Sequence, residues 1–243
     1  MTGGRQRLIV ALDVGRVEEA RALIVELGDS VGVYKIGLEL LVAVGFALAS
    51  ELAAESHAVF IDAKLLDIEA TVERATAAIA KTGAHFLTVH ALDRKTLDAA
   101  VRGRGTNGMK LLGVTVLTNL GSADLVQQGI DQTAPELVLR QATLAQDAGF
   151  DGVIASAQEA PAIRKKAGAG FLIVTPGIRP KGFEANDQAR TMTPAEAIAA
   201  GADYLVIGRP ITRAADPRAA AQAIAGEIAR ALPRRGRASY RRG

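Results

Sequence analysis

Eight short apolar runs alternate with longer, alanine-rich segments along almost the whole chain. The runs have the length of β-strands and are apolar throughout, as expected for strands buried on both faces. We predict the strands at Leu8–Leu12, Val33–Ile36, Ala58–Ile61, Phe86–Val89, Leu111–Leu117, Gly152–Ala155, Phe171–Val174 and Tyr204–Ile207. We predict the helices at Glu18–Leu27, Glu39–Glu55, Glu69–Lys81, Lys95–Val101, Pro135–Ala148, Gln158–Lys166, Pro194–Ala200 and Pro217–Ala231.

Eight β/α units predict a single (β/α)₈ TIM barrel, and a chain of 243 residues has the length of one such domain. The alternative is an open, doubly wound sheet, which usually carries a glycine-rich dinucleotide turn after its first strand. Here the first strand ends in Leu12-Asp13-Val14-Gly15, which has no such turn. We therefore expect a barrel over residues 8–232, preceded by a flexible basic N-terminus at residues 1–7.

Composition narrows the class of protein further. The chain has no cysteine, so disulfides and thiolate metal sites are excluded, and a reducing cytoplasm is the expected location. No apolar run reaches the length of a membrane span, and the N-terminus does not resemble a signal peptide. Five arginines in the last ten residues account for the net charge of +3. We predict that residues 233–243 form a disordered basic tail, and we expect no nucleic acid or membrane partner.

Polar residues follow the predicted strands. In barrel enzymes the active site lies at the C-terminal ends of the strands. Residues at these positions are Asp13, Lys35, Asp62 with Lys64, His90, Thr118, Ser156, Thr175 and Arg209. A polar group at every strand end predicts an active site at this end of the barrel. His90 is the only histidine among them, and no second ligand at suitable spacing indicates a metal site.

The stretch Asp62-Ala63-Lys64-Leu65-Leu66-Asp67 is the most specific of these strand ends. Alternate side chains of an extended chain share a face, so Asp62 and Lys64 are expected to point the same way. Asp67 is too far along the chain to join them by alternation. It belongs to the following turn or reaches a different site.

The last two β/α units have the residues of a phosphate site. Gly208-Arg209 follows the eighth strand, and Thr175-Pro176-Gly177-Ile178-Arg179-Pro180 follows the seventh. Loops after these strands commonly bind phosphate in barrel enzymes, and a guanidinium matches a phosphate dianion. We expect Arg179, Gln188, Gly208 and Arg209 to bind it. The long segment from Gly177 to Met192 is expected to close over it as a lid.

The motif Asp62-x-Lys64-x-x-Asp67 resembles the catalytic signature of the orotidine 5′-phosphate decarboxylase family. Flanking motifs strengthen the resemblance, which spans Leu8 to about Ala231. They are Ala11-Leu12-Asp13, Tyr34-Lys35-Ile36-Gly37, Val114-Thr115-Val116-Leu117-Thr118, the segment Thr175–Pro180 with Gln188, and Val206-Ile207-Gly208-Arg209-Pro210. The resemblance implies a carboxy-lyase that converts orotidine 5′-phosphate to uridine 5′-phosphate and CO₂, the last step of de novo UMP biosynthesis.

The resemblance also implies roles for single residues near the reacting carbon. Lys64 would stabilise and protonate the C6 carbanion left by CO₂, and Asp62 would hold Lys64 and press against the substrate carboxylate. Lys35 would join these charges and contact the ribose, and Asp13 would bind ribose hydroxyls. No metal or cofactor is implied. A preorganised positive charge in a water-excluded pocket would stabilise the carbanion in place of a cofactor that acts as an electron sink.

The remaining implied roles concern the base, the phosphate and a second subunit. Asp67 and Thr71 would reach into the site of a neighbouring subunit, which makes the active unit a homodimer. Ile68 would contact substrate, and Thr118 and Asn119 would lie near the pyrimidine. Arg179, Gln188, Gly208 and Arg209 would bind the 5′-phosphate.

Two departures from the family pattern stand next to these residues. The family usually continues the first motif with Ile-Pro-Asn-Thr, whereas this chain has Ile68-Glu69-Ala70-Thr71, and Asn119 replaces a serine. Two alternatives are open. One is a magnesium-dependent sugar-phosphate decarboxylase or aldolase of the same superfamily, which would need a carboxylate near strand two, where Lys35 stands. The other is a non-catalytic barrel that binds a phosphate ligand.

Overall fold

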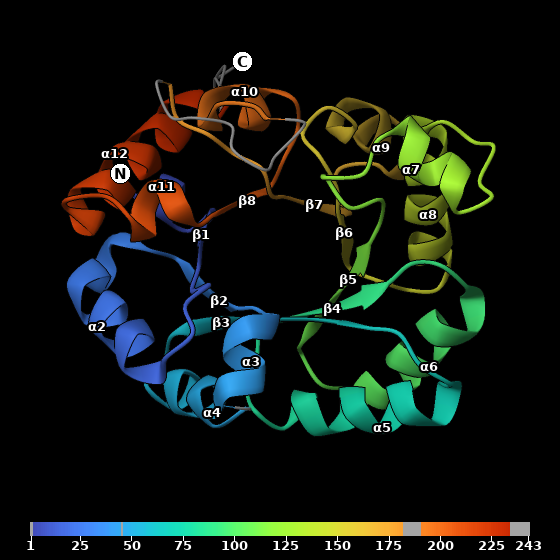
Figure 1. Ribbon diagram of the computed structural model, residues 1–243, viewed down its shortest axis with the longest axis horizontal. Helices are drawn as coiled ribbons and strands as arrows, with labels where there is room; N and C mark the ends of the chain where they lie inside the picture. The colour runs from blue at the N-terminus through green and yellow to red at the C-terminus, as the bar shows by residue number, and fades with distance from the viewer. Residues whose placement is uncertain (1, 45, 182–190, 234–243) are drawn as a thin grey trace, which may run out of the picture.

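The computed structural model describes residues 2–44, 46–181 and 191–233. Eight parallel strands close into a barrel in chain order, and β8 pairs with β1, which confirms the predicted fold class (Figure 1). The strands are β1 Leu8–Ala11, β2 Val33–Ile36, β3 Ala58–Leu65, β4 Phe86–His90, β5 Lys110–Val114, β6 Gly152–Ile154, β7 Leu172–Thr175 and β8 Tyr204–Ile207.

Helices form an outer ring around the barrel (Figure 1). They are α1 Thr2–Arg5, α2 Val17–Leu27, α3 Leu38–Val44, α4 Ala47–Ala54, α5 Glu69–Ala80, α6 Arg94–Arg104, α7 Ser122–Gln127, α8 Ala134–Asp147, α9 Ala160–Ala167, α10 Pro194–Ala199, α11 Arg209–Thr212 and α12 Pro217–Ala231, with a 3₁₀ turn at Gly28–Ser30. The single helix predicted at 39–55 is two helices, α3 and α4. The described part of the chain has no helix that is long and apolar enough to cross a membrane.

Strand alternation divides the apolar side chains between two cores. One face of each strand packs against the surrounding helices. The other face fills the barrel interior with Ile9, Ala11, Val33, Phe60, Phe86, Leu112, Val174 and Val206. The rings of Phe60 and Phe86 meet edge to face at 5.9 Å between centroids. Because this interior is packed, a site can form only above it, where the strands end.

Strands β3 and β5 end more than one residue from their predicted ends, and both differences shape that site. Strand β3 continues four residues beyond Ile61, and its register against β4 shifts between Ile61 and Leu65. Strand β5 ends at Val114 instead of Leu117. The amide and hydroxyl of Thr115 both donate to the carbonyl of Ile154, and the chain then leaves the sheet. Thr118 therefore lies in a loop and not at a strand end.

The flexibility expected for residues 1–7 stays a prediction, and the structure adds a helix in this segment that was not predicted. Residues Thr2–Arg5 form the short helix α1, which packs against α12. Gly4 makes this possible, because a side chain there would collide with the backbone of Ala225. Helix α7 was not predicted. Residues 234–243, the greater part of the predicted basic tail, lie outside the described residues.

Candidate active site

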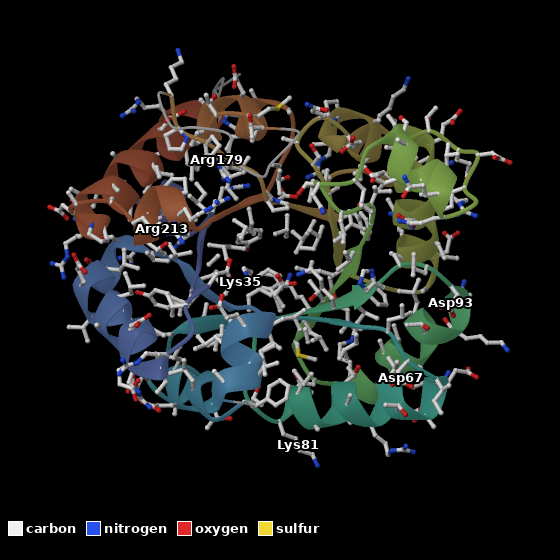
Figure 2. All side chains as sticks on the ribbon, viewed as in Figure 1. Lys35, Asp67, Lys81, Asp93, Arg179 and Arg213 are labelled. Carbon is white, nitrogen blue, oxygen red and sulfur yellow. The ribbon has the colours of Figure 1, made fainter. Side chains whose placement is uncertain are left out.

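A pocket of about 790 Å³ opens at the C-terminal ends of the strands. Predicted site residues that line it are Asp13, Lys35, Asp62, Lys64, Thr118, Asn119, Arg179, Gly208 and Arg209. Figure 2 shows Lys35 near the centre of the barrel, and Arg179 and Arg213 on the side of β8 and α11. The apolar floor includes Phe60, Val114 and Val206. The structure thus brings most of the predicted residues into one cavity.

Four of these residues form a continuous line of alternating charge, which we call the charged array: Asp13, Lys35, Asp62 and Lys64. The Nζ atom of Lys35 lies 2.9 Å from Oδ1 of Asp13 and 3.4 Å from Oδ2 of Asp62. The Nζ atom of Lys64 lies 2.8 Å from the same Oδ2 of Asp62. The prediction that Asp62 and Lys64 share a face is confirmed, because both line the pocket above Phe60.

The two buried members of the charged array hold each other in the ionised form. Burial would raise the pKa of Asp62, but Lys35, Lys64 and a hydrogen bond from Thr88 outweigh burial and lower this pKa. Burial would likewise lower the pKa of Lys35, but Asp62 and Asp13 outweigh it and raise this pKa. Asp62 and Lys35 are 8% and 6% exposed, so little water screens these charges.

Gly37 leaves the space that the charged array needs. A Cβ at this position would lie 2.7 Å from both Oδ1 of Asp13 and Nζ of Lys35. Such a contact is too short, so any larger residue would push the ion pair apart. This explains a glycine two residues beyond Lys35, immediately after β2.

The end of β3 departs from regular strand geometry at Lys64. This residue has φ of +48°, which non-glycine residues rarely adopt. Its amide donates to Oγ1 of Thr88 on β4 at 2.9 Å. The Thr88 hydroxyl donates in turn to Oδ1 of Asp62 at 2.9 Å. Thr88 was missed in the sequence analysis, although its position between Phe86 and His90 places it on the interior face of β4.

The other side of the pocket is lined by arginines. Arg179 is buried, and its amide donates to the carbonyl of Met192 at 2.9 Å, which joins the two ends of the segment predicted as a lid. Arg209 begins α11 directly after Gly208, and Arg213 follows α11. Arg213 also lines the pocket and was not predicted, although it stands one helical turn after Arg209. Gln188 and the rest of 182–190 lie outside the described residues.

Asp67, Ile68 and Thr71 do not line this pocket. Asp67 lies in the turn between β3 and α5, and its Oδ1 accepts a hydrogen bond from the amide of Ile68 at 2.6 Å. Asp67 and Ile68 belong to a separate shallow hollow between the starts of α5 and α6. Figure 2 shows Asp67 beside α5 and α6, far from the side where Arg213 lies. The expectation that Asp67 does not join Asp62 and Lys64 is therefore confirmed.

His90 ends β4 and is half-buried. Burial and the nearby charge of Lys64 lower the pKa of its imidazole, which favours the neutral form. Over the described ranges, no group of three or more histidine, aspartate or glutamate side chains is arranged to hold a metal ion.

Comparison with known proteins agrees with this geometry. The model of the "Orotidine 5'-phosphate decarboxylase / HUMPS family" matches residues 6–224. Proteins named orotidine 5′-phosphate decarboxylase from Caulobacter sp. (strain K31) and Rhodopseudomonas palustris (strain BisA53) are 52% and 53% identical to this chain. Each alignment covers 92% of this chain, and 97% and 95% of the respective relative.

Solved structures are similar as well. The crystal structure of orotidine 5′-phosphate decarboxylase from Lactobacillus acidophilus aligns with a TM-score of 0.80 and 37% identity, over 91% of this chain and 98% of that one. An uncharacterized conserved protein from Geobacillus kaustophilus aligns with a TM-score of 0.78 and 34% identity, over 91% and 99%. The fold and the pocket are those of a (β/α)₈-barrel enzyme. The chain belongs to the orotidine 5′-phosphate decarboxylase / HUMPS family.

Proposed function

We propose that this protein decarboxylates orotidine 5′-phosphate to uridine 5′-phosphate and CO₂ and so serves pyrimidine biosynthesis. The observation that carries the proposal is the Lys64–Asp62 pair, 2.8 Å apart at the end of β3 inside the pocket. The names of the relatives support the same activity. A cytoplasmic location, which a cysteine-free chain suits, stays a prediction.

The chemical step requires stabilisation of a carbanion. When the bond between C6 and the carboxylate breaks, CO₂ leaves and the electron pair stays on C6, in an orbital that cannot delocalise into the ring. The ammonium of Lys64 would stabilise this charge as it forms and then transfer its proton to C6. Stabilisation of this kind is strongest where donors are fixed in advance and water is excluded.

Asp62 would have two tasks in this step. It holds the Lys64 ammonium through a contact of 2.8 Å, and it would face the leaving carboxylate of the substrate. Its own charge is maintained by Lys35, so it can repel that carboxylate without taking up a proton. Lys35 and Asp13, at the other end of the charged array, would bind the ribose hydroxyls. Proton transfer and substrate orientation would thus come from one connected set of charges.

The 5′-phosphate would bind on the arginine-lined side of the pocket. Arg179 and Arg209 offer guanidinium groups, and Gly208 offers a backbone amide near the pocket wall. We also assign Gln188 to this group on the basis of the family motif. Because phosphate lies far from C6, its binding energy can be used to orient the base rather than to hold the reacting atoms. Thr118 and Asn119 would lie against the pyrimidine from the loop after β5.

The active unit would be a homodimer in which Asp67 and Thr71 enter the partner's pocket and Ile68 contacts its substrate. The two large apolar side chains that flank Asp67 are exposed: Leu66 is 50% and Ile68 73% exposed. An apolar cluster of this kind on the rim of a barrel is typical of a surface that a partner covers. Since Asp67 does not line the pocket of its own chain, we propose that it serves the pocket of a partner.

The family description also contains a second class, the HUMPS proteins, so a sugar-phosphate enzyme is the second candidate. Lys35 argues against it, because it places a cation 3.4 Å from Asp62, where an extra carboxylate ligand would be needed to bind magnesium. The third candidate is a barrel that binds phosphate without catalysis. It does not account for the charged array, because buried charges cost stability and need a function to explain them.

One comparison of substrates separates these functions. The protein is incubated with orotidine 5′-phosphate or with a hexulose or ketogulonate phosphate, each with either EDTA or Mg²⁺, and products are identified by chromatography. We expect uridine 5′-phosphate from the first substrate in EDTA and no product from the sugar phosphates. Turnover of a sugar phosphate only in Mg²⁺ would favour the second candidate, and no turnover of either substrate class would favour the third.

A further inference from the structure

Thr88 lies on the interior face of β4, directly above Phe86 and beneath the charged array. It is completely buried. The strand is otherwise apolar on this face until His90, so packing alone does not call for a hydroxyl here. A buried hydroxyl is stable only when its hydrogen bonds are made.

Two hydrogen bonds fix the Thr88 hydroxyl in one orientation. Its Oγ1 accepts from the backbone amide of Lys64 at 2.9 Å, and it donates to Oδ1 of Asp62 at 2.9 Å. The direction is unambiguous, because an ionised carboxylate can only accept and an amide can only donate. Asp62 therefore has Oδ1 on Thr88, while its Oδ2 faces the two lysines.

The hydrogen bond from the Lys64 amide to the Thr88 hydroxyl replaces a backbone hydrogen bond between β3 and β4. Ile61 pairs with Leu87, and Leu65 pairs with Val89. Four residue steps along β3 are therefore matched by only two along β4. The extra residues form a bulge, and Lys64 adopts φ of +48° there. A non-glycine residue in this region persists only where its surroundings hold it. Within the described structure, the Thr88 side chain supplies a partner for the amide at this point.

We propose that Thr88 is a positioning residue for the decarboxylation: its hydroxyl holds the Lys64 backbone and the Asp62 carboxylate in the geometry that aims the Lys64 ammonium at the substrate. The inference rests on the proposed function of the pocket. Thr88 does not line the pocket, so it would act through the two residues it bonds. Removing the hydroxyl leaves Oδ1 of Asp62 without its bond to Thr88, so that only the contacts of Oδ2 orient the carboxylate, and it leaves the strained backbone of Lys64 without this hydrogen bond.

Thr88→Val tests the role, because valine has nearly the shape of threonine and lacks the hydroxyl. We expect kcat for orotidine 5′-phosphate to fall about 10- to 100-fold, since small displacements of reacting groups have effects of this size. The KM should change less than about threefold, because the phosphate contacts lie on the other side of the pocket. Thr88→Ser keeps the hydroxyl and should retain kcat within about threefold of the wild type.

Thr76→Val is the matched control. Thr76 is an equally buried threonine on α5, away from the pocket, so its variant should keep the wild-type kcat. If Thr88→Val does not fold, Thr88→Cys decides, because a thiol is only a weak donor and acceptor and should also lower kcat. An unchanged kcat in Thr88→Val or Thr88→Cys, or a Thr88→Ser variant as slow as Thr88→Val, would overturn the proposal.

Hydrogen exchange of the Lys64 amide, followed by NMR without substrate, separates this inference from the proposed function. We expect the amide to be protected in the wild type and in Thr88→Ser, and to exchange faster in Thr88→Val. A wild-type protein that does not consume orotidine 5′-phosphate would refute the proposed function alone. Equal exchange in the wild type and Thr88→Val would refute the positioning role, whatever the activity.

Discussion

The two carboxylate oxygens of Asp62 have different partners. Oδ2 accepts a hydrogen bond from the ammonium of Lys64 at 2.8 Å, and Oδ1 accepts one from the hydroxyl of Thr88 at 2.9 Å. The carboxylate is thereby held from both sides, and the same Oδ2 is also 3.4 Å from Nζ of Lys35. A cluster of buried charges generally costs stability, so its presence at the end of a barrel strand indicates a function.

Replacing Asp62 with asparagine removes the charge that orients Lys64 and opposes the substrate carboxylate. We expect kcat/KM for orotidine 5′-phosphate to fall by at least about 100-fold, in the range found when one preorganised electrostatic contact is lost. Steady-state ultraviolet assays measure the effect. Asp29→Asn, which removes an exposed carboxylate far from the pocket, is the matched control and should be unchanged. Equal activity in the two variants would contradict the role of Asp62.

Acid stability should depend on Asp62 in a defined direction. Its pKa in the folded protein is lowered below the value of about 3.9 in an unfolded chain. The carboxylate therefore stabilises the fold above pH of about 3.9, and this contribution is lost as pH falls through the lower, folded pKa. Urea unfolding at pH 5, 4 and 3 should show the wild type losing free energy of unfolding faster than Asp62→Asn. If the free energy of unfolding fell equally with pH in the two proteins, Asp62 would not be an ionised group that stabilises the fold.

The arginine-lined side of the pocket should recognise the phosphate and little else. We expect Arg209→Ala to lower kcat/KM for orotidine 5′-phosphate by about 10- to 100-fold, because a charge-assisted contact is worth about 1.5–3 kcal/mol. The same variant should process orotidine, which lacks the phosphate, at the wild-type rate. Arg230→Ala on the outer face of α12 serves as the control. Equal losses with both substrates would place Arg209 outside the phosphate site.

A shared active site can be detected with hybrid dimers. Lys64→Ala and Asp67→Ala proteins should each be nearly inactive. After they are mixed, unfolded and refolded together, we expect about a quarter of wild-type activity, because half of the dimers are hybrids and each hybrid has one site with both residues. Activity that remains at the level of the separate variants would show that Asp67 does not act across a subunit interface.

The sequence was sufficient to predict the barrel, because strands buried on both faces and separated by helices leave few other arrangements. It also predicted the shared face of Asp62 and Lys64, since that follows from alternation along one strand. Thr88 could not be found in the same way. Its role depends on a register shift between β3 and β4, and pairing between strands is not encoded in the alternation of either strand alone.

The other differences concern a helix break, the N-terminal helix and one further pocket residue. The predicted helix at 39–55 is interrupted after Val44, although apolar periodicity continues beyond it. Helix α1 forms because Gly4 lets the chain lie directly against α12, a contact between the two ends of the barrel chain. Arg213 joins the pocket only because α11 carries it one turn beyond Arg209. The contact between α1 and α12 is tertiary, and a local pattern does not show it.

The most direct test of the account is the decarboxylation itself, carried by Lys64 without added metal. Loss of the ultraviolet absorbance of orotidine 5′-phosphate is followed in EDTA with the wild type, with Lys64→Ala, and with Lys110→Ala as a control at the opposite end of β5 from the pocket. We predict turnover by the wild type and Lys110→Ala, and a loss of at least about 1,000-fold in kcat for Lys64→Ala. Undiminished activity in Lys64→Ala, or activity that requires a metal ion, would contradict the account.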